Sequence, residues 1–192
     1  MKTSLRYLLT ALLLSGAAAC VVPPACAQSA ALSTNLAGYA EMGTLNGEAS
    51  WAVGRHWSLH AGGRYNPFTF SGGAEGGQRQ LRQRTLAVGA RFWPWHIYSG
   101  WWVAGKAQAQ EYNFGGFSSP QTQEGDRLGG GLTAGYSYML GPHVNLEAGA
   151  GVWAGQDRYT VYACPSCGRT LDRGNRTFLM LNEVLLSLSY VF

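Results

Sequence analysis

Two cysteines separated by two residues, Cys164 and Cys167 in the segment Cys-Pro-Ser-Cys-Gly, have the spacing of one half of a zinc ribbon. A structural zinc site normally needs four ligands, and the sequence holds no second CxxC motif. No thioredoxin-like βαβ pattern surrounds the pair, which disfavours redox chemistry. In an exported protein a local disulfide is the expected state. We therefore predict a Cys164–Cys167 disulfide, with zinc shared between two chains as the alternative.

A second group of reactive side chains lies on segments in which every other residue is apolar or aromatic. Its members are Glu48, His60, Arg64, Arg91, Lys106 and Glu147. If these segments close into a small barrel, the group faces an interior just wide enough to be filled by side chains. Because an unpaired buried charge is costly, opposite charges there should pair. We predict a polar network that fills the barrel, with a gated proton or ion path as the alternative.

The histidines and arginines suggest no catalytic centre. His56, His96 and His143 fall in predicted turns, and no Ser-His-Asp arrangement is visible from spacing. We expect no catalytic residue, cofactor or metal site.

A basic run, Arg79, Arg82 and Arg84, follows a glycine-rich stretch. These arginines are expected either to be solvated or to contact lipopolysaccharide phosphates, because the guanidinium group matches the geometry of a phosphate.

The elements that must position these residues show the alternation of β-strands. Only 12% of the 192 residues are charged, about half the typical fraction, whereas 46% are hydrophobic and 27 residues are glycine. Apolar and polar residues alternate with period two in eight segments of about ten residues, the length of a tilted membrane-spanning strand. The segments are residues 32–41, 45–53, 57–66, 84–93, 101–110, 128–138, 144–152 and 183–192.

The connections between these segments alternate in length. Short turns are predicted at residues 54–56, 94–99 and 140–143, and long loops at residues 68–83, 113–125 and 160–182. In outer-membrane barrels the short turns face the periplasm and the long loops face outward. Aromatic residues cluster near both strand ends and predict two interfacial girdles, formed by Trp57, Trp93, Trp95, Trp101, Trp102 and Tyr138 at the turns and by Tyr65, Phe68, Tyr112, Phe114 and Tyr159 at the loops.

The two ends of the chain carry signals of export. Residues 1–27 combine Lys2 and Arg6, an apolar core and an Ala25-Cys26-Ala27 cleavage site, which predicts a signal peptide before a barrel domain at residues 28–192. A lipoprotein modified at Cys20 is the alternative. Because residues 28–192 contain no apolar run long enough for a membrane helix, a protein that spans the bilayer would do so as a closed barrel. Tyr190 and the terminal Phe192 match the signal read by the barrel-assembly machinery.

Several short motifs are spread over the chain from residue 32 to residue 168. The motifs are Leu32-Ser33-Thr34-Asn35-Leu36, Arg55-His56-Trp57-Ser58, Gly63-Arg64-Tyr65-Asn66-Pro67, Arg91-Phe92-Trp93, Glu124-Gly125-Asp126, Gly135-Tyr136-Ser137-Tyr138, Asn145-Leu146-Glu147 and Cys164-Pro165-Ser166-Cys167-Gly168. Together they resemble the domain-of-unknown-function 3575 family, small bacterial outer-membrane-barrel-like proteins similar in outline to the outer-membrane protein A barrel. Ser33 departs from a lysine expected in many relatives. The resemblance implies the fold and leaves the activity open.

These observations predict an all-β fold: an eight-stranded antiparallel transmembrane up-and-down barrel in the outer membrane, after a cleaved signal peptide. The expected role is non-enzymatic and concerns envelope structure, adhesion or partner binding. Expected partners are outer-membrane lipid, lipopolysaccharide, the barrel-assembly machinery and a surface or envelope partner. A net charge of +4 gives no sign of nucleic-acid binding. The alternatives are a small barrel enzyme acting on lipid or peptide, and a soluble periplasmic barrel of lipocalin type.

Overall fold

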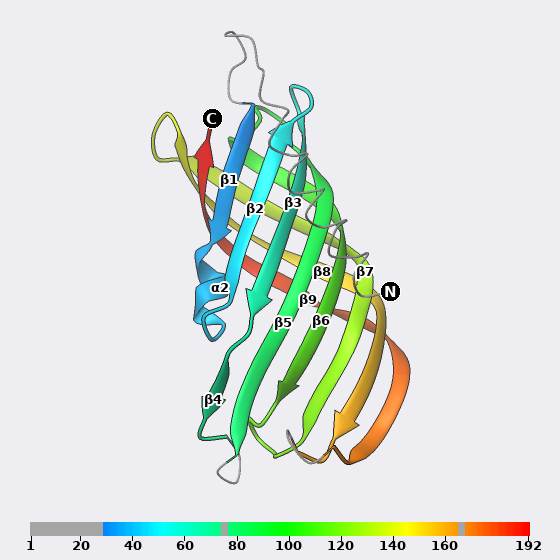
Figure 1. Cartoon of the computed structure of the whole chain (residues 1–192). Helices are drawn as coiled ribbons and strands as arrows, with labels where there is room; N and C mark the ends of the chain where they lie inside the picture. Colours follow the sequence, from blue (N-terminus) through cyan, green and yellow to red (C-terminus); the bar gives the residue numbers. More distant parts are fainter. Residues whose placement is uncertain (1–28, 74–76, 165–167) are drawn as a thin grey trace, which may run out of the picture.

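The computed structural model describes residues 29–73, 77–164 and 168–192, which form a closed antiparallel barrel (Figure 1). The prediction of eight main strands is confirmed, and a short strand, β4, follows β3 along the edge of β5. Each main strand pairs with the next one along the chain, including β3 with β5, and β9 pairs with β1 to complete the barrel. The strands are β1 (Ala30–Asn35), β2 (Leu45–Ala52), β3 (Trp57–Asn66), β4 (Thr69–Ser71), β5 (Gln78–Phe92), β6 (Gly100–Gly115), β7 (Thr122–Met139), β8 (Val144–Tyr162) and β9 (Thr170–Val191).

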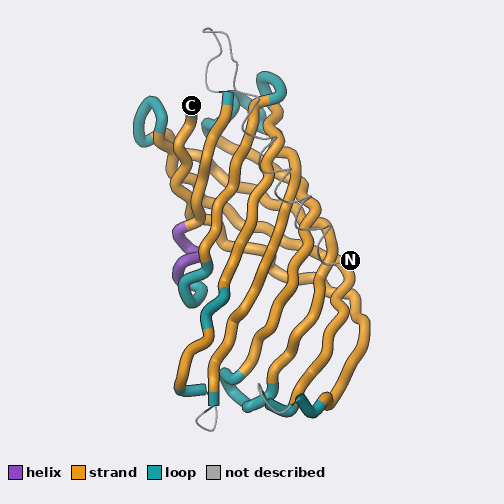
Figure 2. Tube along the Cα trace, in the orientation of Figure 1, coloured by secondary structure: helices purple, strands orange, loops and turns teal. Residues whose placement is uncertain are grey.

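Strands β5 to β9 are longer than the sequence predicted. The three long loops expected at residues 68–83, 113–125 and 160–182 are wrong, because most of these residues continue the antiparallel ladder. At the loop end, strands β5 to β9 extend beyond the apolar part of the barrel and carry polar residues on both faces. Without an apolar face the period-two signal disappears, although the backbone still pairs. Figure 2 shows a nearly continuous strand wall with loops at its two ends and shorter loop segments beside the helix, part-way along the wall.

The first predicted strand, residues 32–41, is wrong in its second half. Strand β1 ends at Asn35, and a short helix, α2 (Leu36–Ala40), follows it. The Asn35 side chain explains the change, because its Oδ1 accepts a hydrogen bond from Ala37 N at 3.1 Å and caps the helix. No helix in the described part of the chain is long and apolar enough to cross a membrane.

Strands β1 and β9 share only five register pairs, residues 31–35 opposite 187–191. Where this seam ends, the side chain of Asn35 makes hydrogen bonds to the backbone of β9 that a continuing β1 would otherwise make. Its Oδ1 also accepts from Leu186 N at 3.1 Å, and its Nδ2 donates to Val184 O at 3.2 Å. Beyond this point α2 lies against β9.

The two faces of the wall have opposite character. Outward side chains are apolar and exposed, including Leu59, Val88, Val103, Leu132, Val152 and Leu186. Inward side chains at the alternate positions are buried and largely polar, including Ser58, His60, Thr133, Ser137, Glu147 and Ser189. Alternation alone cannot say which face points inward. The structure shows that the polar side chains point into the barrel and the apolar side chains point outward.

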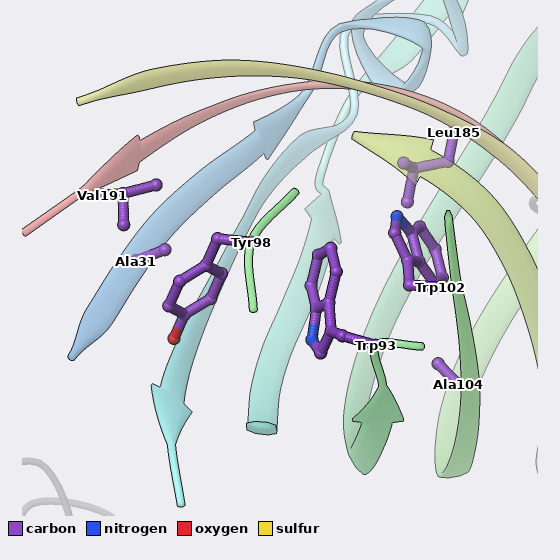
Figure 3. Close-up of a cluster of buried hydrophobic side chains, with 7 residues drawn as sticks. All are labelled: Ala31, Trp93, Tyr98, Trp102, Ala104, Leu185 and Val191. Atoms are coloured by element: carbon purple, nitrogen blue, oxygen red, sulfur yellow. The ribbon is translucent and has the colours of Figure 1, made fainter. Parts of the chain in front are cut away.

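Aromatic side chains fill the turn end of the barrel. Trp93, Tyr98 and Trp102, here called the aromatic plug, are each at most 1% exposed (Figure 3). Trp93 packs against both other rings, at centroid distances of 5.8 and 6.2 Å, and its indole N–H donates to Ser58 Oγ at 3.0 Å. The prediction that Trp93 and Trp102 belong to an interfacial girdle is therefore wrong. Exposed Trp57, Trp95, Trp101 and Tyr138 do lie on the outer surface at this end.

Candidate functional site in the barrel interior

Three of the predicted interior residues form a buried ion-pair cluster, here called the Arg91 network. Arg91 on β5 binds Glu48 on β2 through Nη2 and donates from Nη1 to Glu147 Oε2 on β8 at 3.1 Å. The Arg91 and Glu147 side chains are 5% and 3% exposed. Ser189 Oγ donates to the other Glu147 oxygen at 2.9 Å. Two carboxylates from different strands thus hold one guanidinium, which lies over the Trp102 ring of the aromatic plug.

The other three predicted residues lie in the same interior. His60 is buried opposite Gly89, and a Cβ at Gly89 would lie 2.8 Å from the imidazole and 2.3 Å from the Gly105 carbonyl oxygen. This close approach explains why glycine occupies the position. Arg64 and Lys106 line, together with Glu48, a small cavity of about 50 Å³. All six predicted residues therefore face the interior: Arg91, Glu48 and Glu147 form the ion-pair cluster, His60 packs opposite Gly89, and Arg64 and Lys106 line the small cavity.

A second cluster, here called the Asp157 network, lies toward the loop end and was not predicted. The Asp157 carboxylate is fully buried, and Arg176 donates to its Oδ2 from Nε and Nη2, both at 2.8 Å. Tyr112 donates to Asp157 Oδ1 at 2.8 Å. Arg127 lies 3.5 Å from Asp157 and 3.9 Å above the Tyr112 ring. Tyr112, expected in the outer aromatic girdle, is instead 4% exposed and part of this cluster.

A signal for this second cluster was present in the sequence. The inward positions Asn145 and Glu147 continue in steps of two to Trp153 and Asp157, which are buried as the same parity requires. The alternation predicts a strand that ends at residue 152 and a last strand that begins at residue 183, so Asp157 lies outside every predicted strand and Arg176 lies in the predicted loop at residues 160–182. Phe114 was likewise expected in the girdle, but its ring packs on Tyr112 at 4.8 Å.

Hydrogen bonds and ring packing hold the interior in place. At the plug, Asn145 Nδ2 and Ser137 Oγ donate to the Tyr98 carbonyl oxygen at 2.6 and 3.2 Å. Burial raises the pKa of the Tyr98 hydroxyl above its usual range. Among the described residues, no three His, Cys, Asp or Glu side chains are grouped to hold a metal ion.

Comparison with known proteins identifies a family. The family model DUF3575, described as a protein of unknown function, matches residues 8–192. This chain belongs to the DUF3575 family. The match includes every strand of the barrel, so the whole fold belongs to the family region. No curated protein and no solved structure matches this DUF3575 chain significantly.

The structure also places the remaining predicted residues of this DUF3575 protein. Cys164 is disulfide-bonded, but Cys167 lies outside the described residues, as does the predicted signal peptide, so the Cys164–Cys167 pairing stays a prediction. Tyr190 and Phe192 are exposed on the outer surface, their rings 4.9 Å apart. Phe192 N donates to Ala30 O at 2.8 Å and ties the last residue to β1. Arg79, Arg82 and Arg84 lie on β5 and not in a loop.

Proposed function

We propose that this protein is an exported, integral outer-membrane barrel. The observation that carries the proposal is the charge-free outer face. On β6 the outward residues from Trp101 to Ala109 are aromatic, aliphatic or glycine, and the next outward residue, Glu111, carries the first charge. Ten residues at about 3.4 Å each, tilted by about 40°, rise roughly 25 Å, the height of the apolar band of such barrels.

Water would be a poor solvent for this surface. Exposed leucines, valines and aromatic residues occur on the outside of all the main strands, whereas a soluble monomer rarely exposes a large contiguous apolar surface. A soluble barrel of lipocalin type needs the opposite arrangement, with an apolar interior. The buried Arg91 and Asp157 networks disfavour that alternative.

We further propose that the role is non-enzymatic and concerns the envelope. The aromatic plug and the two ion-pair networks fill successive levels of the interior, as expected of a barrel too narrow for a pore. The connections at the loop end would then make the contacts with a surface or envelope partner. Tyr190 and Phe192 are proposed to be read by the barrel-assembly machinery during insertion.

The test is fractionation combined with site-specific cleavage on intact cells. One variant carries a protease site between Ser118 and Ser119, in the exposed connection from β6 to β7, and a matched variant carries it in the exposed turn at residues 54–56. We expect the protein in the outer-membrane fraction, migration on a gel that changes with heating, and cleavage only at the Ser118 site. A soluble periplasmic product, or cleavage of the turn site in intact cells, would overturn the proposal.

A further inference from the structure

Strand β9 has an open edge toward the loop end of the barrel. Its residues 187–191 pair with β1, and α2 lies against the strand where this seam ends. From Thr170 to Leu181 the strand pairs with β8, and no second strand of the described chain pairs with it there. Figure 1 shows this part of β9, drawn in orange, at the margin of the sheet. An unpaired strand edge is a template for a further strand.

The register of β9 shows which backbone groups face the open edge. Near the end of the chain Val191 N donates to His143 O on the β8 side. The bulge in β9 adds one residue, so beyond it the N–H and C=O groups of odd-numbered residues face away from β8. Arg173 N agrees with this direction, because it donates to Asp172 Oδ1 at 2.8 Å. The odd-numbered residues therefore form a backbone edge that can bond an added strand.

The open edge carries an excess of positive charge. Arg173 points outward and is exposed, and Arg176 points inward with a side chain that is 47% exposed. Arg176 shares the single carboxylate of Asp157 with Arg127, which leaves the Asp157 network with one positive charge in excess. Asp172 is the one acidic residue in this part of β9. An added strand with acidic side chains therefore meets a cation on each face of the sheet.

The inner side of the open edge borders the mouth of the barrel interior. The mouth has a volume of about 890 Å³ and is centred on one inward-facing row, formed by Asn66, Gln83, Tyr112, Gly125, Tyr159 and Gly174 on six neighbouring strands. The row ends on β9 at Gly174, which has no side chain to occupy the space. Inward side chains of a strand added beyond β9 would enter the mouth and would not meet a packed core.

We infer that the open edge of β9 binds an extended acidic segment of a partner protein, which joins the sheet as an additional strand. Backbone hydrogen bonds supply the affinity, and Arg173 and Arg176 select acidic side chains on the two faces. A second copy of this chain fits less well, because antiparallel pairing of two β9 edges would invert one barrel relative to the other in the membrane. The inference rests on the proposed function only for the outward position of the loop end.

The test measures binding of labelled peptides to purified, detergent-folded protein by fluorescence anisotropy. The probe is a short peptide of valine and threonine with two adjacent glutamates at its centre, which point to opposite faces of a strand. One comparison peptide has lysines in place of the glutamates, and another is N-methylated throughout, so that its backbone cannot donate hydrogen bonds. We expect the acidic peptide to bind at least about tenfold more tightly than either comparison peptide.

Two variants at one position separate the backbone edge from its side chains. Thr177→Pro removes an N–H that faces away from β8, so the pairing of β8 with β9 is kept. Thr177→Ala keeps this N–H and is the matched control. We expect Thr177→Pro to bind the acidic peptide about tenfold more weakly and Thr177→Ala to bind like the wild type. Arg173→Gln should weaken binding about threefold, as for an exposed ion pair.

Heat-modifiable migration verifies that each variant is folded. Absence of binding, equal binding of the three peptides, or equal binding by the two Thr177 variants would overturn the inference. A dimer in detergent that Thr177→Pro dissociates would also overturn it, because a second copy would then occupy the edge. The assay does not depend on location in the cell, so failure to bind refutes the open edge alone. A soluble product on fractionation would refute the proposed function alone.

Discussion

Arg91 and Glu147 form a 3.1 Å hydrogen bond although they lie on β5 and β8, three strands apart around the barrel. Neither side chain reaches its partner along the sheet, so the bond crosses the interior. Glu48 binds the same guanidinium from β2, on another part of the wall. The Arg91 network therefore links three parts of the wall that share no backbone hydrogen bonds with one another.

We predict that Glu147→Ala destabilises the folded barrel strongly. Removing one partner of a buried ion pair leaves an uncompensated charge, which costs about 3 to 5 kcal/mol. Urea unfolding of protein folded into lipid vesicles, followed by tryptophan fluorescence, measures the change. The matched control is Glu111→Ala, which removes the exposed partner of Arg84 and should cost less than about 1 kcal/mol. Equal losses in the two variants would refute the interior role of Glu147.

Gly89→Ala should also destabilise the barrel, because the added methyl group would meet the His60 ring and the Gly105 carbonyl oxygen. Overpacking of this kind costs about 1 to 3 kcal/mol. At Gly47, on the outer face of β2, a methyl group meets nothing within 4 Å. Gly47→Ala is therefore the control and should leave the urea midpoint nearly unchanged. A neutral Gly89→Ala variant would show that His60 packs elsewhere.

The outward face of β7 provides a test of membrane contact. Leu132→Arg places a charge on the exposed apolar surface and should lower the yield of assembled protein, since arginine at the midplane of the lipid face costs about 2 to 4 kcal/mol. Replacement of its buried neighbour Thr133 by serine, which keeps the hydroxyl, should leave assembly nearly unchanged. Outer-membrane fractions and heat-modifiable migration measure assembly of both variants. If Leu132→Arg and Thr133→Ser assemble equally well, the outer face does not contact lipid.

Deletion of Phe192 should reduce the folded fraction. The residue is exposed beside Tyr190, and its backbone N–H bonds to Ala30 at the start of β1, so its loss affects both recognition and closure. Phe192→Tyr keeps an aromatic terminus and is the control. The folded fraction is read from heat-modifiable migration in cells. An unchanged fraction after deletion would exclude a role for Phe192 in assembly.

Replacing both Cys164 and Cys167 by serine should leave the stability of the barrel close to that of the wild type. A bridge between residues three apart closes a very short loop and constrains the unfolded chain little. Urea unfolding measures stability, and thiol labelling of intact cells before and after reduction tests the bridge. Free thiols in the native protein would contradict the disulfide, and destabilisation by a chelator would indicate metal binding between chains.

The parts of the fold that the sequence predicted are those in which one face of a strand is apolar and the other is polar. Leu132 and Thr133 illustrate this, because Leu132 is exposed on the outer face and Thr133 is buried in the interior. Toward the loop end, beyond Arg84, Glu111 and Asp126, both faces of the strands are polar, and the pattern contains no information about strand continuation. Asp157 and Arg176 were missed for that reason. Helix α2 was missed because Asn35 ends β1 through tertiary bonds to Leu186 and Val184, which no local pattern reveals.

The short seam between β1 and β9 has a consequence for the order of folding. All other neighbouring main strands follow one another along the chain, so each can form as a local hairpin. The seam joins residue 31 to residue 191 and has by far the largest sequence separation. Closing such a long loop costs much chain entropy, and only five register pairs compensate for it. The curved sheet is thus expected to form first and to close last. The amides of these five pairs should exchange with solvent sooner than those of β7 and β8.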